Sequence, residues 1–571
     1  MKRTRNLSHL RYIRFAAAAA VVAYLLFREG DRPEWLEGSN ATLILAFIAV
    51  AAITSWACRA QRLHFSLRAH RTLKYVLIFP LLVIIPVAVY LGQGQIAAAI
   101  FGTVIAVYVV LFYAVGAACP KCGASLTYIH NRMRHALAIG CVVTLLGSAT
   151  GIGNAADRTA WSAGAAEIKI TPGESDLYAK ALVIQDASEQ TLVMVTLDLI
   201  SVPGPLRAFV EEHLQTSRGL GPASLLMNCS HTHSGPEIRM TGSALAGLTP
   251  ERRQKSIAYV EQLRADILHA IDEAFAAMAP VKLTYHKARA GFAMNRRLWR
   301  DGRYINHPNP DGRVDHDVPV LKVEGAEGMI KAFVFGYACH NTTLGTYEIN
   351  GDYAGYAQEY VEATHPGAVA MFMMGCGGDQ NPYPRRTVEA AQAHGRNLAT
   401  AVEAALETEA VPLTGSLALG FKKVELDYAE APTDADLEAM AQSSSKYDRR
   451  YAERLQREIE QGTLIRSYPA PVQVIRIGNE LLFVALPGET VVDYSLRIKR
   501  ENRGENAPEV WVAGYSNDVF AYIPSERVLL EGGYEAGGAM RYMTTVVQPG
   551  PFAPDVEKRL MEGVDALIKQ T

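Results

Sequence analysis

The chain has 571 residues, of which 49% are hydrophobic and 20% charged, proportions that exclude a collagen-like, low-complexity or wholly disordered protein. The net charge of −2 hides two unlike parts: residues 1–150 carry 15 Lys and Arg but four acidic residues, and the remainder carries 41 basic and 54 acidic residues. An acidic second part would be repelled by phosphates, so we expect no nucleic-acid partner.

The first part, residues 1–155, contains five apolar stretches separated by short connections. They are Phe15–Phe27, Ala41–Cys58, Tyr75–Leu91, Gln95–Cys119 and Ala136–Gly153. A helix needs about 20 apolar residues to cross a bilayer, and all but the first stretch come close to that length. We therefore predict a multi-pass membrane region of about five helices.

Basic residues indicate how this region is oriented. They cluster at 2–14, 59–74 and 121–134. Basic loops stay in the cytoplasm, and all three clusters can do so only if the N-terminus is cytoplasmic and the chain crosses five times. Residues 157–571 then lie outside the cytoplasm, on the periplasmic or secreted side. In an alternative interpretation a signal peptide begins at Met133, and the same residues are exported.

The seven cysteines do not favour a disulfide scaffold. Cys119 and Cys122 form one CxxC pair, which is half of a zinc ribbon, and the sequence contains no second pair. We interpret this pair as a tight turn, with a metal or redox role as the alternative. The exported part holds only Cys229, Cys339 and Cys376, an odd number.

From residue 161 onward, short strand-like runs alternate with amphipathic segments. Strands are expected at 166–170, 179–185, 191–198, 223–229, 281–287, 318–323, 330–338, 367–374, 414–426, 472–477, 480–486 and 509–515. Helices are expected at 204–216, 251–278, 354–364, 386–408 and 554–569, and a charged, solvent-facing helical arm at 433–461. Because no flexible linker interrupts this part, we predict one mixed α/β layered domain over 157–571, with a metal site at strand ends.

The strongest local signal is the run NCSHTHSGP at 228–236, which follows an apolar strand. Side chains alternate along a strand, so His231 and His233 point to the same side. Neutral imidazole is the commonest protein ligand for zinc. The run therefore favours a metal site, the alternative being a polar turn with hydrogen-bonded histidines.

Metal-capable residues follow other apolar strands in the same way. His340 follows the strand 332–338 and Glu489 follows the strand 481–486. Open α/β sheets gather their sites at the carboxyl ends of strands. Two histidines and a glutamate are a usual catalytic zinc set, which leaves a position for water and lowers its pKa towards about 7. We expect one Zn²⁺ per chain.

The run MGCGGDQNP at 374–382 is the other conspicuous stretch. Its glycines could aim backbone N–H groups, around Gly377 and Gly378, at an oxyanion. Asp379 could orient a histidine or a water molecule. The alternative is a tight strand-to-helix turn. Asp198, at the end of the strand 191–198, has the same ambiguity and favours a structural role.

Four runs together resemble the neutral/alkaline non-lysosomal ceramidase family, in the family's order and over roughly residues 161–550. These runs are CSHTHSGP at 229–236, YACHNT at 337–342, LPGET at 486–490 and NDVFAYIP at 517–524. The family is a zinc amidase that hydrolyses the N-acyl bond of ceramide. The resemblance implies that His231, His340, Glu489 and Tyr522 are the metal ligands. It implies catalytic positions for His233, Arg296 and Tyr534, with Asp379 and Asn381 in the matching loop.

Two departures from the family bear on the function. Asn381 stands where the family has its catalytic serine, and the family's C-terminal immunoglobulin-like domain has no counterpart after the helix expected at 554–569. Asparagine cannot act as a nucleophile, but metal-activated water does not require one. We expect a zinc-dependent hydrolase of a linear amide in an N-acyl lipid, held at a membrane by its N-terminal helices. The alternatives are a non-catalytic lipid-binding membrane sensor and a zinc esterase.

Overall fold

The structure, a computed structural model, describes residues 161–171, 176–240, 245, 248–543 and 546–571. All of them belong to one compact unit, Ala155–Thr571. The apolar stretches predicted to cross the membrane, and the pair Cys119 and Cys122, lie outside the described residues. Among the helices that the structure describes, none is long and apolar enough to cross a membrane.

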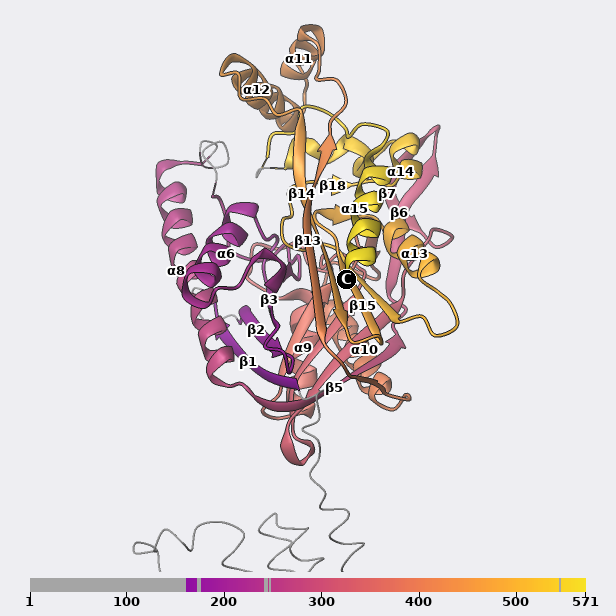
Figure 1. The fold of residues 1–571 in the computed structure, drawn as a ribbon. Helices are drawn as coiled ribbons and strands as arrows, with labels where there is room; N and C mark the ends of the chain where they lie inside the picture. The colour runs from indigo at the N-terminus through magenta and orange to yellow at the C-terminus, as the bar shows by residue number, and fades with distance from the viewer. Residues whose placement is uncertain (1–160, 172–175, 241–244, 246–247, 544–545) are drawn as a thin grey trace, which may run out of the picture. The chain divides into compact units, whose positions relative to one another are not determined.

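A mixed nine-stranded sheet forms the centre of this unit (Figure 1). Its strands in spatial order are β10 (Val369–Met374), β9 (Ile330–Tyr337), β8 (Asp317–Glu324), β5 (Ala279–Arg289), β1 (Trp161–Lys169), β2 (Tyr178–Gln185), β3 (Thr191–Leu197) and β4 (Leu225–Cys229), with β12 (Val411–Leu413) paired to β5. The pairs β9–β10 and β3–β4 are parallel and the others antiparallel. Every residue of β3 and β4 is buried, as expected where both faces of parallel strands are covered.

Three further sheets complete the unit. They are β13 (Leu417–Asp427), β14 (Ser467–Ile477), β15 (Leu481–Ala485) and β17 (Glu509–Ala513); then β11 (Gln380–Pro382), β6 (Ala293–Arg300) and β7 (Arg303–Asn309); then β16 (Glu489–Thr490) and β18 (Tyr522–Ile523). A hairpin joins β14 and β15, and Gly478 in its turn has φ 61°, which glycine adopts without strain.

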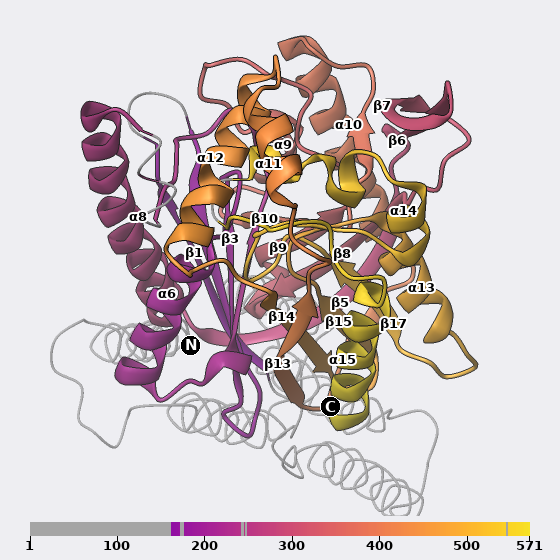
Figure 2. The ribbon, with the colours of Figure 1, turned by 90° about the horizontal axis from the view of Figure 1, so that it is seen from above.

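Helices flank the two large sheets, and all but the two helices within 434–460 cover their outer faces. They are α6 (Gly204–Arg218), α8 (Pro250–Ala276), α9 (Asp352–Thr364), α10 (Val388–Leu406), α11 (Asp434–Ala441), α12 (Lys446–Glu460), α13 (Val492–Glu501), α14 (Glu526–Glu531) and α15 (Val556–Gln570). One buried cluster joins α6, α8, α9 and α10 to the nine-stranded sheet, a second lies between the two sheets, and a third joins the four-stranded sheet to α13, α14 and α15. The layers therefore run helix, sheet, sheet, helix (Figures 1 and 2).

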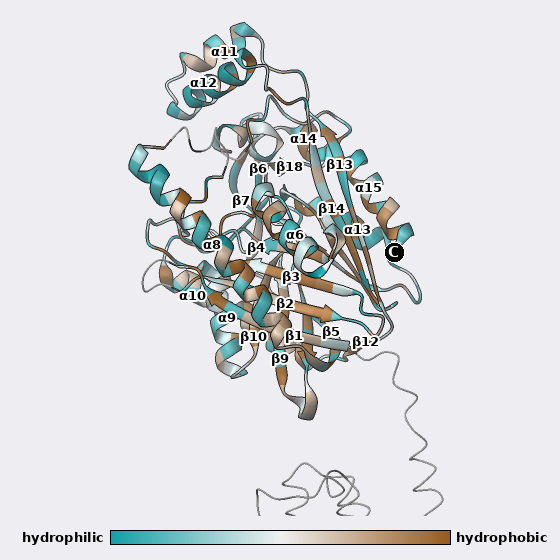
Figure 3. Ribbon diagram, turned by 60° about the vertical axis from the view of Figure 1, so that its left-hand side comes forward, coloured by the Kyte–Doolittle hydropathy of each residue, from teal (hydrophilic) through white to brown (hydrophobic). Residues whose placement is uncertain are grey.

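The predicted mixed α/β layered domain is confirmed, and each expected strand or helix overlaps an observed one. The charged arm expected at 433–461 consists of two helices, α11 and α12, which stand out at one end of the unit (Figure 3). It is not wholly solvent-facing, because Tyr451 and Leu455 of α12 are buried in a cluster with Val547. The strands β6 and β7 and the helices α13 and α14 were not expected from the sequence.

Candidate metal centre

Each of the four residues expected to bind metal follows a buried strand. His231 follows β4, His340 follows β9, Glu489 follows β15, and Tyr522 follows β17. The pairs β3–β4, β9–β10 and β15–β17 are parallel, so within each pair the carboxyl ends lie at the same edge. The site therefore forms where open α/β sheets usually carry theirs.

Short backbone pairings bring these strand ends together. Glu489 and Tyr522 are register partners in the parallel pair β16–β18, so their side chains leave the same face. A bridge between Asn228 and Ser516 ties the end of β4 to the loop that leads from β17 to Tyr522. Asn228 strengthens this connection by donating a hydrogen bond from Nδ2 to the carbonyl of Gly514 at 2.8 Å.

The donor atoms of the four side chains converge. Nε2 of His340 lies 3.1 Å from Oε2 of Glu489 and 3.0 Å from the hydroxyl oxygen of Tyr522. Nε2 of His231 lies 3.3 Å from the same oxygen of Glu489. Ligand atoms placed tetrahedrally about 2.1 Å from a zinc ion are separated by about 3.4 Å. The spacing and chemistry of this donor set therefore fit a zinc ion.

His233 adds a third imidazole to the centre. Its Nε2 lies 3.1 Å from Nε2 of His231. Ligand atoms of His231, His233 and His340 all lie within 4.8 Å of one another, so the three histidines could also hold a metal ion. Unlike the other two, His233 is exposed, which lets it contact a molecule that approaches from the surface.

Backbone carbonyls fix the orientation of both buried imidazoles. Nδ1 of His231 donates to the carbonyl of Ile200 at 2.6 Å, and Nδ1 of His340 donates to the carbonyl of Gly377 at 2.7 Å. Because a carbonyl oxygen only accepts, each Nδ1 carries the proton and each Nε2 presents its lone pair to the centre. His231 has φ 60°, a left-handed conformation that is uncommon outside glycine.

The electrostatic environment favours the protonation states that bind a metal. Burial lowers the pKa of His340 to about 4, and the positive charge of Arg296 acts in the same direction. Burial alone would raise the pKa of Glu489, but His231 and His340 outweigh it and hold this pKa well below its usual range. A neutral imidazole and an ionised carboxylate are the forms that coordinate metal ions.

Arg296 connects the metal centre to the other expected catalytic residues. Its Nη2 donates to the hydroxyl of Tyr522 at 3.2 Å, its Nη1 donates to Oδ1 of Asn381 at 3.2 Å, and its Nε donates to Glu535 at 2.9 Å. The guanidinium carbon lies 5.4 Å from the ring centroid of Tyr534. The structure therefore places Arg296, Asn381 and Tyr534 beside the centre.

Asp379 does not orient a histidine, contrary to one of the roles considered for it. Its carboxylate accepts hydrogen bonds from the N–H of Val492 at 2.9 Å and from Nδ2 of Asn295 at 3.0 Å. It thus connects its own loop to strand β6 and to the first residue of α13. Asp198 is structural, as the sequence favoured, because it accepts from the side chain of Gln358 at 3.1 Å.

The oxyanion role considered for the glycine loop, the run at 374–382, is also wrong. The N–H of Gly377 donates to the carbonyl of Gly375 at 2.8 Å, and the N–H of Gly378 donates to the carbonyl of Thr490 at 2.9 Å. Neither group is left for an oxyanion. The loop acts instead through the carbonyl of Gly377, which orients His340.

Sequence reasoning missed two residues of the centre. The hydroxyl of Tyr515 donates to Oε2 of Glu489 at 3.2 Å, and its ring centroid lies 4.6 Å from that of His231. Glu535 accepts from both arginines of the run Arg296–Arg297. Glu535 could have been found from its position next to Tyr534, for which a catalytic role was expected. No local sequence pattern indicated Tyr515.

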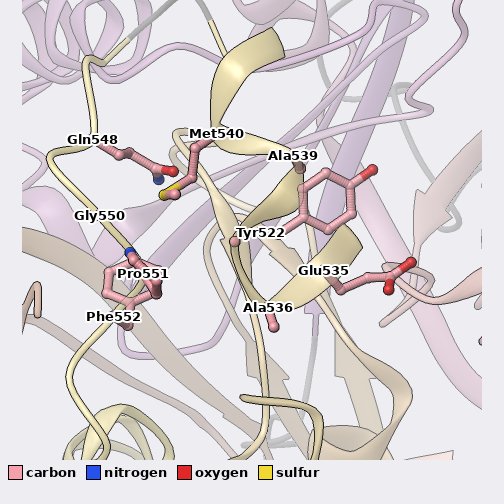
Figure 4. A pocket seen from close by; sticks show the side chains of 10 residues that line it. Tyr522, Glu535, Ala536, Ala539, Met540, Gln548, Gly550, Pro551 and Phe552 are labelled. Atoms are coloured by element: carbon pink, nitrogen blue, oxygen red, sulfur yellow. The ribbon is translucent and has the colours of Figure 1, made fainter. Parts of the chain in front are cut away.

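A small cavity borders the ring of Tyr522 (Figure 4). Its other lining residues include Met540, Gln548 and Pro551, and the hydroxyl of Tyr522 points away from Gln548 and Pro551. The cavity volume is about 10 Å³. This is room for about one water molecule, so the cavity is not a substrate site.

Comparison with known proteins relates the chain to ceramidases. Residues 166–397 match the family described as neutral/alkaline non-lysosomal ceramidase, N-terminal; this segment contains His231 and His340 and ends before Glu489. No curated protein matches the sequence.

Two solved structures are similar to this chain. One is the neutral ceramidase from Pseudomonas aeruginosa, with a TM-score of 0.55, 18% sequence identity and coverage of 72% of this chain and 74% of that chain. The other is described as a ceramidase complexed with C2, with a TM-score of 0.54, 19% identity and coverage of 72% and 75%. At these identities the likeness shows a shared fold. The match of residues 166–397 to the neutral/alkaline non-lysosomal ceramidase family confirms the resemblance that the motifs indicated.

Proposed function

We propose that this protein is a zinc-dependent amidohydrolase that cleaves the linear amide bond of an N-acyl lipid resembling ceramide. The observation that carries the proposal is the convergence of two imidazole nitrogens, a carboxylate oxygen and a phenol oxygen, from His231, His340, Glu489 and Tyr522, at spacings of 3.0 to 3.3 Å. The family of residues 166–397 supports the choice of an amide as the substrate.

The chain's own residues would prepare the reaction. A zinc ion held by the four ligands would supply a Lewis acid that polarises the amide carbonyl and lowers the pKa of water. Arg296 holds the hydroxyl of Tyr522 and places a positive charge where negative charge develops on the carbonyl oxygen. The exposed His233 is placed to donate a hydrogen bond to that oxygen or to protonate the leaving amine.

A second candidate function, lipid binding without turnover, rests on Asn381. Asparagine occupies the position of the family's serine and cannot form a covalent acyl intermediate. Steady product formation by the purified protein would exclude this candidate. Hydrolysis of an ester but not of the matched amide would instead identify the protein as an esterase.

We also propose that the catalytic unit works outside the cytoplasm, next to the membrane that holds its substrate. The support is the sequence of residues 1–155, with its five apolar stretches and its basic connections. Reporter fusions after residue 155 would test this. An enzyme reporter that is active only in the periplasm should be active there, and a reporter active only in the cytoplasm should be silent.

The central experiment is the metal content of the full-length protein, purified in detergent, as wild type and as His231→Ala and His340→Ala variants. His269→Ala is the matched control, because His269 is an exposed histidine on α8 that pairs with Glu273. We expect the wild type and the control to hold one more zinc ion per chain than the two other variants, and to hydrolyse N-acyl sphingosine. A folded wild type that zinc fails to load would contradict the proposal.

A further inference from the structure

Four tyrosines form a continuous row from the candidate metal centre to the surface. The ring centroids of Tyr522 and Tyr534 are 5.4 Å apart, those of Tyr534 and Tyr542 are 6.1 Å apart, and those of Tyr542 and Tyr447 are 4.8 Å apart. The inner end is buried and the outer end is exposed, since Tyr522 is 9% exposed whereas Tyr542 and Tyr447 are 46% and 40% exposed. The row therefore links the metal-binding phenol to the outside of the protein.

The outermost tyrosine comes from a separate segment, which buried contacts hold in place. Tyr447 lies in the first turn of α12, whereas Tyr534 and Tyr542 belong to the segment between α14 and α15. The hydroxyl of Tyr451 on α12 donates to the carbonyl of Gln548 at 2.5 Å. A buried apolar cluster also joins the α11–α12 hairpin to that segment. The end of α12 is thus fixed at the outer end of the row.

The chemistry of the row suits a hydrocarbon chain. Aromatic rings offer large apolar faces at a low cost in side-chain entropy, because tyrosine has few rotatable bonds. The inner end is Tyr522, whose hydroxyl lies 3.0 Å from Nε2 of His340, so a chain lying on the row has one end at the reacting bond. The groups that flank the amide of an N-acyl lipid are hydrocarbon chains.

We propose that Tyr534, Tyr542 and Tyr447 form the wall along which a hydrocarbon chain of the substrate lies, and that α12 thereby sets the preference for chain length. This inference rests on the proposed amidase function and goes beyond it, since it assigns substrate contacts to the charged arm. Each methylene buried on such a wall should raise kcat/KM by up to about fourfold. Chains too short to reach Tyr447 should gain nothing from it.

The test uses the full-length protein in detergent micelles of constant composition. One series of N-acyl sphingosines varies the acyl chain from acetyl through hexanoyl to dodecanoyl, and a second varies the sphingoid chain with the acyl chain fixed. The variants are Tyr447→Ala and Tyr542→Ala. Tyr447→Phe keeps the ring, and Ile459→Ala removes another exposed apolar side chain of α12, about 18 Å along the helix from Tyr447.

We expect Tyr447→Ala and Tyr542→Ala to lower kcat/KM for the longest chains of one series by about fivefold or more, and to leave the shortest members unchanged. Tyr447→Phe and Ile459→Ala should keep the wild-type dependence on chain length. The inference is overturned if Tyr447→Ala retains that dependence in both series. A wild type that hydrolyses no member of either series refutes the proposed function itself, and the inference with it.

Discussion

Arg296 donates a buried hydrogen bond from Nη1 to Oδ1 of Asn381 at 3.2 Å. This bond engages the acceptor of the amide. Its Nδ2 donates one hydrogen to the hydroxyl of Tyr383 at 3.4 Å, which leaves the second hydrogen as a donor. We therefore expect Asn381 to stabilise the oxyanion and Asn381→Ala to lower kcat for an N-acyl amide by about a hundredfold, which is the usual effect of losing one such donor. Initial rates at saturating substrate would measure this.

Metal content and the Asn381→Asp variant provide the controls. Zinc bound per chain should be unchanged in Asn381→Ala, because Asn381 is not a ligand. Asn381→Asp should be at least as impaired, since its negative charge would oppose charge development on the substrate and would pair with Arg296. Wild-type turnover in Asn381→Ala would show that the residue at the serine position takes no part in the reaction.

His233 separates the two possible ligand sets. If the ligands are His231, His340, Glu489 and Tyr522, then His233→Ala should bind zinc with nearly unchanged affinity but lose about a hundredfold or more in kcat. If the three histidines hold the ion, the same variant should lose zinc as His231→Ala does. Zinc titration with a competing chelator, run beside the kinetics, distinguishes these outcomes.

Gly378 gives a test of how closely the strand β16 must approach the glycine loop. A Cβ atom there would lie 2.5 Å from the carbonyl oxygen of Glu489, so Gly378→Ala must displace the strand that carries a metal ligand. We expect a loss of about 1–3 kcal/mol in unfolding free energy and a zinc affinity at least about tenfold weaker. A Cβ atom on Gly355 in α9 has no neighbour within 4 Å, so Gly355→Ala should be neutral or slightly stabilising. Equal behaviour of the two variants would contradict this.

Glu535 holds two buried arginines. Its carboxylate accepts from Arg296 at 2.9 Å and from Arg297 at 2.7 Å, and all three side chains are at most 5% exposed. Removing one partner of a buried ion pair costs about 3–5 kcal/mol, so Glu535→Gln should lower the thermal midpoint and release Arg296 from Tyr522. Glu531→Gln is the control, because Glu531 contacts Arg297 but not Arg296 and is 19% exposed. A kcat that falls equally in both variants would argue against a specific role for Glu535.

The residues that could be predicted from sequence carry their signal locally. An apolar run predicts a strand, and His231, His340 or Glu489 directly after such a run is thereby predicted to lie at the end of that strand. The spatial order of the strands could not be predicted, because a buried strand such as β3 shows its burial but not its neighbours. The stacking of the two sheets through residues such as Trp511 and Phe483 depends on contacts between distant segments.

The structural features that could not be predicted depend on residues far along the chain, and their local sequence indicates something else. The strand β6 reads AMNRRLWR, and two adjacent arginines ordinarily indicate an exposed segment. They are buried here because Glu535, far along the chain, accepts from both. The oxyanion role considered for the glycine loop fails for a similar reason. The N–H of Gly378 donates to the carbonyl of Thr490, which lies in another segment of the chain.

Asp518 predicts a pH dependence of stability that is separate from the metal ligands. Its carboxylate accepts from the N–H of Gly204 at 3.0 Å and from the hydroxyl of Tyr468 at 2.6 Å, and burial raises its pKa from 3.8 to about 6. Because the folded pKa exceeds the unfolded one, the carboxyl contributes stability that is fully present below about pH 4 and is lost as the pH rises through about 6. The loss amounts to at most about 3 kcal/mol.

The Asp518→Asn variant isolates this contribution, because an amide side chain at this position cannot titrate. The difference in thermal midpoint, wild type minus variant, should fall between about pH 4 and pH 6 and stay level above about pH 7. Both proteins carry the same metal ligands and the same other carboxyl groups, so zinc loss and general acid effects cancel in the difference. A difference that is constant from about pH 4 to pH 7 would show that Asp518 titrates alike in the folded and unfolded chains.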